Sequence, residues 1–486
     1  MTHKSATSAD GKTTMKVANP LHRVWTGTMS VSARRALYLV AGGLCGLAAV
    51  LQPAMALAQE SQEGPAQPAM AAKLTILHSF VSTAGQDGWT PRGGVTFDGQ
   101  GALYGTTVRG GPPDICPATT QGCGTVYRLT PPVASKKAWK ETVLYNFGTR
   151  DGDGNGPYGA VTVGAGGALF GTLSSFGPTL LYKLTPPVAP KKVWIETQLR
   201  EVKLSNDPAS SFDGLIADQD GAFYGTTFQG GANTGGNCSA YGCGTAFKLT
   251  PPVAPKRNWK FTVLHNFAGG RDGRGPVTSL AADKDSSGNI IMLYGTTGSG
   301  GGSGCGGSGC GTVYALTVPA AGMHVWKETV LHRFAGGSDG SDLNNSLTVV
   351  DGDLYGMTTA GGTSFRGTIF KLARPVAPKN VWKKTVLYNF LDGAPAWPGH
   401  LVADLNGDLY GMAAGGTSSV GVLFKLMPPV AHSKVWTQAV LYNFADTPDG
   451  AFPTGGLTAG PDGNFYGTTS AGGASNVGTV FKLVLP

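Results

Sequence analysis

The stretch D-G-D-G-N-G-P, residues 151–157, carries the residue types of a cation site. Asp151, Asp153 and Asn155 place oxygen ligands at alternate positions, and the glycines between them permit a sharp turn. This pattern matches the first half of an EF-hand-type calcium loop. Calcium is therefore the one cofactor that the sequence suggests. No other part of the sequence requires a cofactor.

The remainder of the chain offers a control for this interpretation. The twelfth position of such a loop is Thr162, where calcium coordination needs a bidentate glutamate. Asp339-Gly340 repeats the Asp-Gly pair without a following proline. Asp-Gly followed closely by proline also occurs at 87–91, 272–276, 392–395 and 449–453. We therefore interpret the Asp-Gly pair chiefly as a recurring turn.

Six of the seven cysteines form three local pairs, and the seventh, Cys45, lies near the N-terminus. An even number of locally paired cysteines in an exported chain predicts disulfides. Zinc binding is the alternative, but no histidine accompanies any pair. The predicted disulfide cysteines are Cys116 with Cys123, Cys238 with Cys243, and Cys305 with Cys310.

The histidines provide weaker candidates. His78, His265 and His332 occupy a repeat position that holds tyrosine in other copies, which indicates a packing or surface role. His400 has no such counterpart and is the more interesting single residue. The sequence contains no nucleophile elbow, HExxH zinc motif or phosphate loop, so no catalytic residue is assigned.

These residues must be positioned by a tandem repeat. The segment L-Y-G-T-T-V-R-G-G (103–111) occurs in seven related copies. Each copy is followed by a second segment similar to G-T-V-Y-R-L-T-P (124–131). A third segment, similar to K-E-T-V-L-Y-N-F (140–147), also occurs seven times. A weaker segment, such as G-G-V-T-F (93–97), precedes each copy. The copies align on Tyr104, Phe170, Tyr224, Tyr294, Tyr355, Tyr410 and Tyr466.

All four segments are short, rich in β-branched and aromatic residues, and bounded by Gly, Pro or Asp, which is typical of strands. Four strands, named a to d, in seven repeats predict an all-β, seven-bladed β-propeller over residues 73–486. The repeats begin with a lone strand d (74–80) and end with a lone a-b-c set. Pairing of these two ends would complete the seventh blade and close the ring.

The linkers between strands c and d repeat as well, as in P-P-V-A-P-K-K-V-W (186–194). Each ends in tryptophan, which we expect to pack between blades, with an aromatic platform for carbohydrate as the alternative. Alternating strand direction predicts that the d–a and b–c loops share one face. The six tryptophans are Trp139, Trp194, Trp259, Trp326, Trp382 and Trp436.

With Y-G-T-T-x-x-G-G, G-T-V-F-K-L and V-L-Y-N-F in place, residues 73–486 resemble the GloVer tandem-repeat proteins. The resemblance implies an exported bacterial repeat protein and supplies no catalytic residues. Members of this family carry variable sorting signals at the C-terminus. This chain stops at Pro486, directly after its last strand c, so we expect release into the periplasm or the medium.

The N-terminus has the composition of an export signal. Arg34 and Arg35 precede an apolar run, and Ala56-Leu57-Ala58 forms a cleavage site, so we predict a signal over 1–58 (with Met29 as an alternative start) and a flexible linker over 59–72. The apolar run of 16 residues is short for a membrane anchor, which needs about 20. Residues 1–58 carry +5 of the formal charge of +8, so a nucleic-acid partner is not indicated.

We therefore predict a secreted, monomeric, non-catalytic propeller that binds a glycan or protein at the cell surface, with no membrane span after signal cleavage. The alternative is an extracytoplasmic carbohydrate-active enzyme, a lyase or hydrolase, with its site at the central channel. Such a site should interrupt the repeat at positions that face the channel. Asp218, Asp283 and Asp404 recur in part of the repeats, but they lie near the a–b turn, where aspartate is ordinary turn chemistry.

Overall fold

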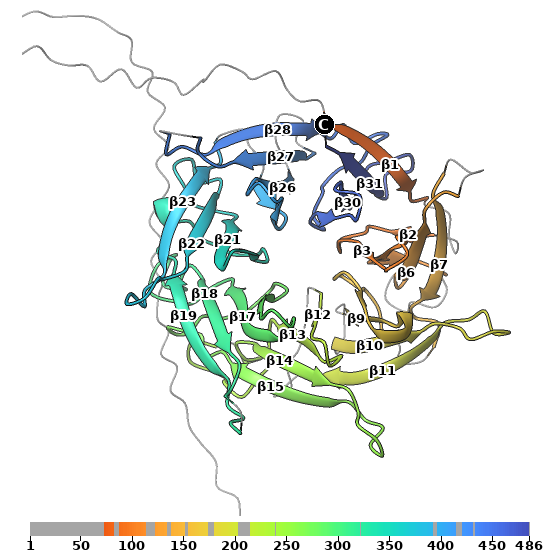
Figure 1. Ribbon diagram of the computed structural model, residues 1–486, viewed down its shortest axis with the longest axis horizontal. Helices are drawn as coiled ribbons and strands as arrows, with labels where there is room; N and C mark the ends of the chain where they lie inside the picture. The colour runs from red at the N-terminus through yellow and green to blue at the C-terminus, as the bar shows by residue number, and fades with distance from the viewer. Residues whose placement is uncertain are drawn as a thin grey trace, which may run out of the picture. The chain divides into compact units, whose positions relative to one another are not determined.

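Each repeat forms a four-stranded antiparallel sheet, and seven sheets surround a central axis (Figure 1). The predicted all-β, seven-bladed propeller is confirmed. The predicted signal, 1–58, lies outside the part of the chain that the structure describes and stays a prediction. The computed structural model describes residues 72–81, 87–112, 122–133, 138–150, 154–173, 179–202, 214–238, 240–320, 322–391, 396–414, 420–430 and 433–485.

In every blade strand a is innermost and strand d is outermost. The first blade contains β3 (Thr96–Phe97), β4 (Leu103–Thr107), β6 (Thr125–Thr130) and β7 (Lys140–Asn146). The second contains β8 (Thr162–Val163), β9 (Leu169–Leu173), β10 (Thr179–Thr185) and β11 (Ile195–Val202). The third contains β12 (Ile216–Ala217), β13 (Phe223–Thr227), β14 (Thr245–Thr250) and β15 (Lys260–Asn266). The fourth contains β16 (Ala281–Lys284), β17 (Ile290–Thr297), β18 (Thr312–Thr317) and β19 (Lys327–Arg333).

The remaining blades follow the same order. The fifth contains β20 (Thr348–Val350), β21 (Asp353–Thr358), β22 (Thr368–Ala373) and β23 (Lys383–Asn389). The sixth contains β25 (Val402–Ala403), β26 (Leu409–Ala414), β27 (Val422–Met427) and β28 (Thr437–Asn443), with β24 (Ala396–Pro398) added to β26. The seventh contains β29 (Thr458–Ala459), β30 (Phe465–Thr469), β31 (Thr479–Val484) and β1 (Lys73–Ser79). Two short 3-10 turns also occur, η2 (Ala165–Gly167) and η3 (Gly337–Asp339).

The ring closes as the fractional repeats predict. Strand β1, from the start of the described chain, pairs antiparallel with β31 at its end, with Lys73 opposite Val484. The N-terminal strand thus becomes the outer strand of the blade built from the C-terminal residues (Figure 1). This pairing removes a sheet edge that would otherwise expose unpaired backbone groups.

The Y-G-T-T sequence of strand b meets a separate demand at each position. Its glycine admits the aromatic ring of strand c, because a Cβ on Gly225 would lie 2.8 Å from Cζ of Phe247. Its first threonine reaches the next blade, as Thr106 Oγ1 donates to the Gly159 carbonyl at 2.9 Å. Its second threonine joins strand c, as Thr107 Oγ1 lies 2.8 Å from Thr125 Oγ1. The motif is therefore maintained by packing within and between blades.

The repeated tyrosine and tryptophan meet across blade interfaces. In five blades the tryptophan packs on the strand-b aromatic of the preceding blade, with Trp326 6.0 Å from Tyr224 and Trp382 6.0 Å from Tyr294 between ring centroids. Edge-on aromatic contacts of this kind add to the free energy gained from burial. The structure thus places the tryptophans at blade contacts, not on an exposed platform. The same contact joins Trp139 to Tyr466, Trp259 to Phe170 and Trp436 to Tyr355.

We predict that Gly225→Ala destabilises the propeller. The added methyl group would meet both Phe247 and Leu215 Cδ2, at 2.9 Å from the latter, and the well-packed core cannot move aside cheaply. The free energy of unfolding should fall by about 1–3 kcal/mol, measured as a lower melting temperature. Gly99→Ala is the control, because a Cβ there meets nothing within 4 Å. Equal melting temperatures for the two variants would contradict this account of strand b.

Candidate functional site

A cavity of about 280 Å³ lies among the innermost strands of the propeller. Its wall comes from six blades, so it surrounds the central axis. The side chains that line it offer one guanidinium, one imidazole, two amides, hydroxyl groups and an aromatic ring. They are Arg92, Tyr158, Val277, Asn344, Asn345, Ser346, His400 and Thr454, together with Gly93, Gly94, Gly399 and Gly455.

Every lining residue comes from the three positions before a buried residue that immediately precedes strand a. These positions precede a buried aliphatic residue, such as Val95, Leu347 or Leu401, which enters the core of its blade. We call this buried residue the anchor. The three residues before each anchor lie next to the central axis. The corresponding segment of the third blade, up to residue 213, lies outside the described residues.

The repeat is interrupted at these axial positions. Three residues before the anchor, the blades hold Arg92, Tyr158, Val277, Asn344 and Thr454, which share no side-chain type. The neighbouring Y-G-T-T and G-T-V-F segments stay nearly constant. The sequence contained this signal, but only the structure shows that the variable positions face one cavity.

Glycine backbone forms much of the wall. A Cβ on Gly94 would lie 2.7 Å from the Gly455 carbonyl oxygen, and one on Gly93 would lie 2.7 Å from the Ala160 nitrogen. Neighbouring blades therefore meet here at backbone contact, as they do at glycine in other crowded positions. The wall is rigid, and the few large side chains determine the chemistry of the cavity.

His400 and Arg92 are the basic residues of the described lining. At the position of His400, other blades have the small residues Gly94, Ser346 and Gly456. The imidazole lies over Gly456, where a Cβ would approach its Cε1 to 2.0 Å. The guanidinium of Arg92 stands 5.7 Å from the centroid of the Tyr158 ring, within range of a cation–π contact.

The cavity lies at the face that carries the disulfide loops. Strand β2 (Gly88–Trp89), in the d–a loop, pairs with β5 (Arg109–Gly110), in the b–c loop, so the two loop sets share one face as predicted. Disulfides join Cys238 to Cys243 and Cys305 to Cys310 within b–c loops. Cys116, the predicted partner of Cys123, lies outside the described residues.

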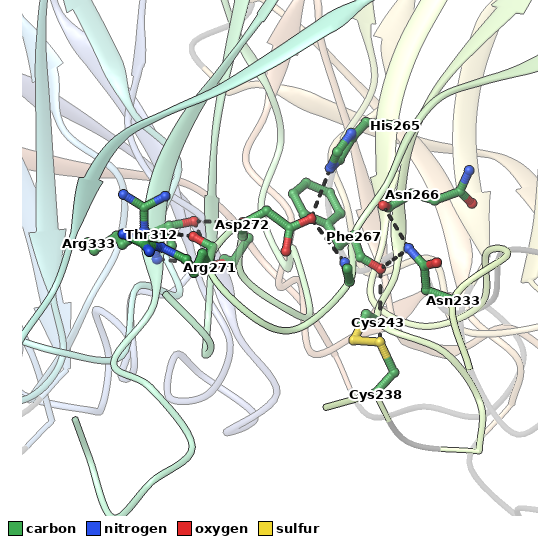
Figure 2. Close-up of polar contacts among 12 residues, drawn as sticks. Asn233, Cys238, Cys243, His265, Asn266, Phe267, Arg271, Asp272, Thr312 and Arg333 are labelled. Atoms are coloured by element: carbon green, nitrogen blue, oxygen red, sulfur yellow. Dashed lines mark hydrogen bonds and ion pairs between the residues drawn. A yellow bond between two sulfur atoms is a disulfide. The ribbon is translucent and has the colours of Figure 1, made fainter. Parts of the chain in front are cut away.

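Figure 2 shows how one such loop is held against its blade. Asn233 Nδ2 donates to the carbonyls of Asn266 and Phe267 at 3.1 and 3.0 Å, close to the Cys238–Cys243 bridge. The loop is thus fixed to the end of strand d. This face combines a cavity with ordered loops, which is the usual setting of a binding site on a scaffold.

The Asp-Gly turns use their carboxylates internally. In Figure 2, Asp272 accepts from the Ala268 backbone at 3.0 Å and lies 3.2 Å from His265 Nε2. Tyr442 makes the equivalent contact with Asp449. Histidine and tyrosine interchange at this position because both can donate to the turn aspartate. The same contact joins His78 to Asp87 and His332 to Asp339.

The calcium hypothesis concerns residues that the structure only partly describes. Asp151 and Asp153 lie outside the described residues, and Asn155 lies within them. No group of three or more metal-binding side chains occurs among the residues that are described. Calcium at this turn therefore stays a prediction, although four related aspartates serve as turn anchors.

The aspartates near the a–b turns have a structural role. Asp218 accepts from the Ala222 backbone at 2.8 Å and from the Tyr224 hydroxyl at 2.9 Å. Asp404 repeats both contacts, with the Asp408 backbone and with Tyr410. These carboxylates lie at the other end of strand a from the cavity. They close the turn, and they account for the tyrosine at the second position of strand b in these blades.

A set of buried tyrosine and glutamate residues was not among the candidates found from the sequence. The blades with tyrosine in strand c also have glutamate in strand d, whereas the others have phenylalanine without glutamate. The hydroxyls of Tyr127 and Tyr314 are buried without hydrogen-bond partners, as is one carboxylate oxygen of Glu141 and of Glu328. The sequence signal that could have revealed these pairs is that the tyrosine and the glutamate occur in the same repeats. The pairs are Tyr127 with Glu141, Tyr182 with Glu196 and Tyr314 with Glu328.

Glu141 and Glu328 face the turn of the preceding blade. Burial raises the pKa of Glu141 to about 7, with a further increase from Asp87 and an opposing effect of His78. In the fifth blade Lys384 replaces the glutamate, and its Nζ lies 2.7 Å from Asp339. Burial raises the pKa of Asp339, but hydrogen bonds from His332 and Lys384 outweigh it and hold this pKa well below its usual range. The contacts of Lys384 with Asp339 thus join the fifth blade to the fourth.

The sequence matches the model of the Gloeobacter/Verrucomicrobia repeat family over residues 67–307, 175–393 and 306–486. No curated protein matches the chain. Among solved structures, polysaccharide lyase Uly1 is similar at 9% identity and a TM-score of 0.45, over 88% of this chain and 94% of that one. A gluconolactonase from Xanthomonas campestris is similar at 13% identity and a TM-score of 0.34, over 71% and 86%. Similarity at this level says nothing about activity.

None of the described residues forms a helix long and apolar enough to cross a membrane. The two disulfides are consistent with export.

We predict that Glu141→Gln stabilises the protein at alkaline pH. The pKa of Glu141 is about 7 in the folded chain and 4.5 as a reference value, so folding favours the protonated form. Stability from this residue is therefore present below pH 4.5 and declines as pH rises through 7. Glutamine stays neutral, so at pH 8.5 the variant should gain roughly 1 kcal/mol after solvent screening.

The measurement is the melting temperature of both proteins at pH 5 and pH 8.5. The gain should be larger at pH 8.5 than at pH 5. Asp351→Asn, at an exposed turn residue, removes the same charge and should show little dependence on pH. A gain for Glu141→Gln that is equal at both pH values would contradict the raised pKa.

Proposed function

Because the chain belongs to the Gloeobacter/Verrucomicrobia repeat family, we propose that it is an extracytoplasmic binding propeller that recognises a glycan in its axial cavity. The observation that carries this proposal is the interruption of the repeat at the residues that line the cavity. Export is supported by the predicted signal and by the disulfides.

The fold imposes the same demands on every blade. Residues required by packing therefore recur, as the strand-b glycine and threonines do. Arg92, Tyr158 and Asn344 occupy equivalent positions in different blades and share no side-chain chemistry. Their variety is not needed by the fold, and their convergence on one concave surface is typical of ligand recognition.

The composition of the wall favours a sugar. Amide, hydroxyl, guanidinium and imidazole groups can hydrogen-bond sugar hydroxyls from several directions. Tyr158 supplies an aromatic ring against which the apolar face of a sugar can pack. The rigid glycine wall keeps these groups in place, which lowers the entropic cost of binding.

A carbohydrate-active enzyme is the second candidate, and His400 is the observation that favours it. An imidazole in a cavity can act as a general acid or base near neutral pH. A hydrolase would also need two carboxyl groups at the bond that is cleaved. The described lining residues supply none, so we place binding first.

We predict that the purified mature chain binds at least one glycan on a polysaccharide array and that His400→Ala weakens this binding. Loss of one buried polar contact should reduce affinity about 5- to 10-fold in calorimetry. His324→Ala is the matched control, because this exposed histidine lies in a c–d linker away from the cavity. Binding that is unaffected by His400→Ala would place the ligand elsewhere.

Incubation with the bound polysaccharide separates the two candidates. Turnover that produces new reducing ends or unsaturated products, and that His400→Ala abolishes, would establish an enzyme. Binding without turnover would support the binding propeller.

A further inference from the structure

We propose that the axial cavity selects a sugar that carries a carboxylate, and that Arg92 and Asn345 hold this group. The inference rests on the proposed function, because it names the class of glycan that the same cavity would accept.

The charge of the cavity wall favours an anion. Arg92 contributes a full positive charge, and the described lining residues include no carboxylate to balance it. None of the ion pairs among the described residues involves Arg92, whose exposed guanidinium stacks near Tyr158. Its planar fork of N–H donors matches the two oxygens of a carboxylate, which makes bidentate binding the favoured geometry.

Asn345 provides a second, independent observation. This residue lines the cavity and is 7% exposed, and its Nδ2 is buried without a hydrogen-bond partner. Buried amide donors are nearly always paired, so an unpaired one calls for an explanation. An acceptor on a ligand in the cavity would supply the missing partner after a small movement of the side chain.

The fold itself does not require asparagine at this position. Gly93, Gly399 and Gly455 stand at the equivalent place in other blades, where they leave only backbone at the wall. The backbone carbonyl of Asn345 already accepts from Thr296 Oγ1 at 3.4 Å, as the equivalent carbonyl of Gly93 accepts from Thr468. The interblade contact is thus made by the backbone, and the side-chain amide is available for a ligand.

The neighbouring amide has a different partner. Asn344 Nδ2 donates to Asp342 Oδ1 at 2.8 Å, outside the cavity lining. Arg92 and Asn345 are therefore the two lining donors that we assign to the carboxylate. A cavity of about 280 Å³ is near the lower limit of small-molecule pockets, which suits one or two sugar rings better than a long chain segment.

The test compares cellotriose with its C6-oxidised form, cellotriouronic acid, by calorimetry on the mature chain. The two trisaccharides have the same backbone and differ only in their carboxylates. The acidic sugar should bind at least 10-fold more tightly than the neutral one, since a charge-assisted pair exceeds a neutral hydrogen bond. Its affinity should also fall as ionic strength rises.

Arg92→Gln should remove most of this preference for the acidic sugar. Glutamine keeps one N–H donor group, but it lacks the positive charge and the paired N–H geometry of the guanidinium. Affinity for the acidic sugar should fall about 10-fold, and this fall should exceed any fall for the neutral sugar, which forms no ion pair with Arg92. Asn345→Ser should also lower the affinity for the acidic sugar. Arg109→Gln is the matched control, because this exposed arginine lies on the same blade and face but not in the cavity wall.

The outcomes distinguish this proposal from the one on which it rests. Equal affinity for both sugars, unchanged by Arg92→Gln, would reject carboxylate recognition and leave glycan binding intact. Binding of neither sugar, nor of any glycan on the array, would reject both. If acetate binds as tightly as the acidic sugar, the cavity is a general anion site and selection of a sugar is rejected. Melting curves of each variant must match the wild type for these comparisons to count.

Discussion

The propeller depends on hydrogen bonds from threonine hydroxyls to the backbone of the next blade. Thr106 donates to Gly159, and Thr468 donates to Gly93, at 2.9 and 3.0 Å. Because the acceptors are carbonyls just before strand a, the innermost segments approach at backbone distance, and glycine is favoured there. The same bonds satisfy buried carbonyls and define the wall of the axial cavity. The interaction that joins the blades thus also builds the candidate site.

Because the backbone makes the wall, the fold does not fix the type of side chain at these positions. Arg92, Asn345 and His400 can therefore differ from their counterparts without disturbing the blades. In many folds, loops on a rigid scaffold likewise carry the binding residues while the scaffold provides the stability. It explains how a strongly repetitive chain can present an asymmetric surface at its centre.

Polar residues elsewhere serve the contacts between blades. The turn aspartates bind histidine or tyrosine of their own strand d, and a glutamate, lysine or glutamine of the next blade faces the same turn. Tyr388, for example, donates to Gln438 at 3.2 Å. Such groups must be satisfied together, since an unpaired buried charge is costly. In the blades where the Asp-Gly turn is described, its aspartate belongs to this structural network.

The sequence by itself determined the seven blades, the strand order and the closure of the ring, because each depends on local periodicity repeated many times and on fractional repeats at both ends. It also fixed the shared face of the d–a and b–c loops, which follows from alternating strand direction. It could not reveal that Arg92, Asn345 and His400 share one cavity, since they are far apart in the chain and meet only around the axis. Nor could it tell a paired amide from an unpaired one. Those properties depend on burial and on contacts between blades, which only the tertiary structure decides.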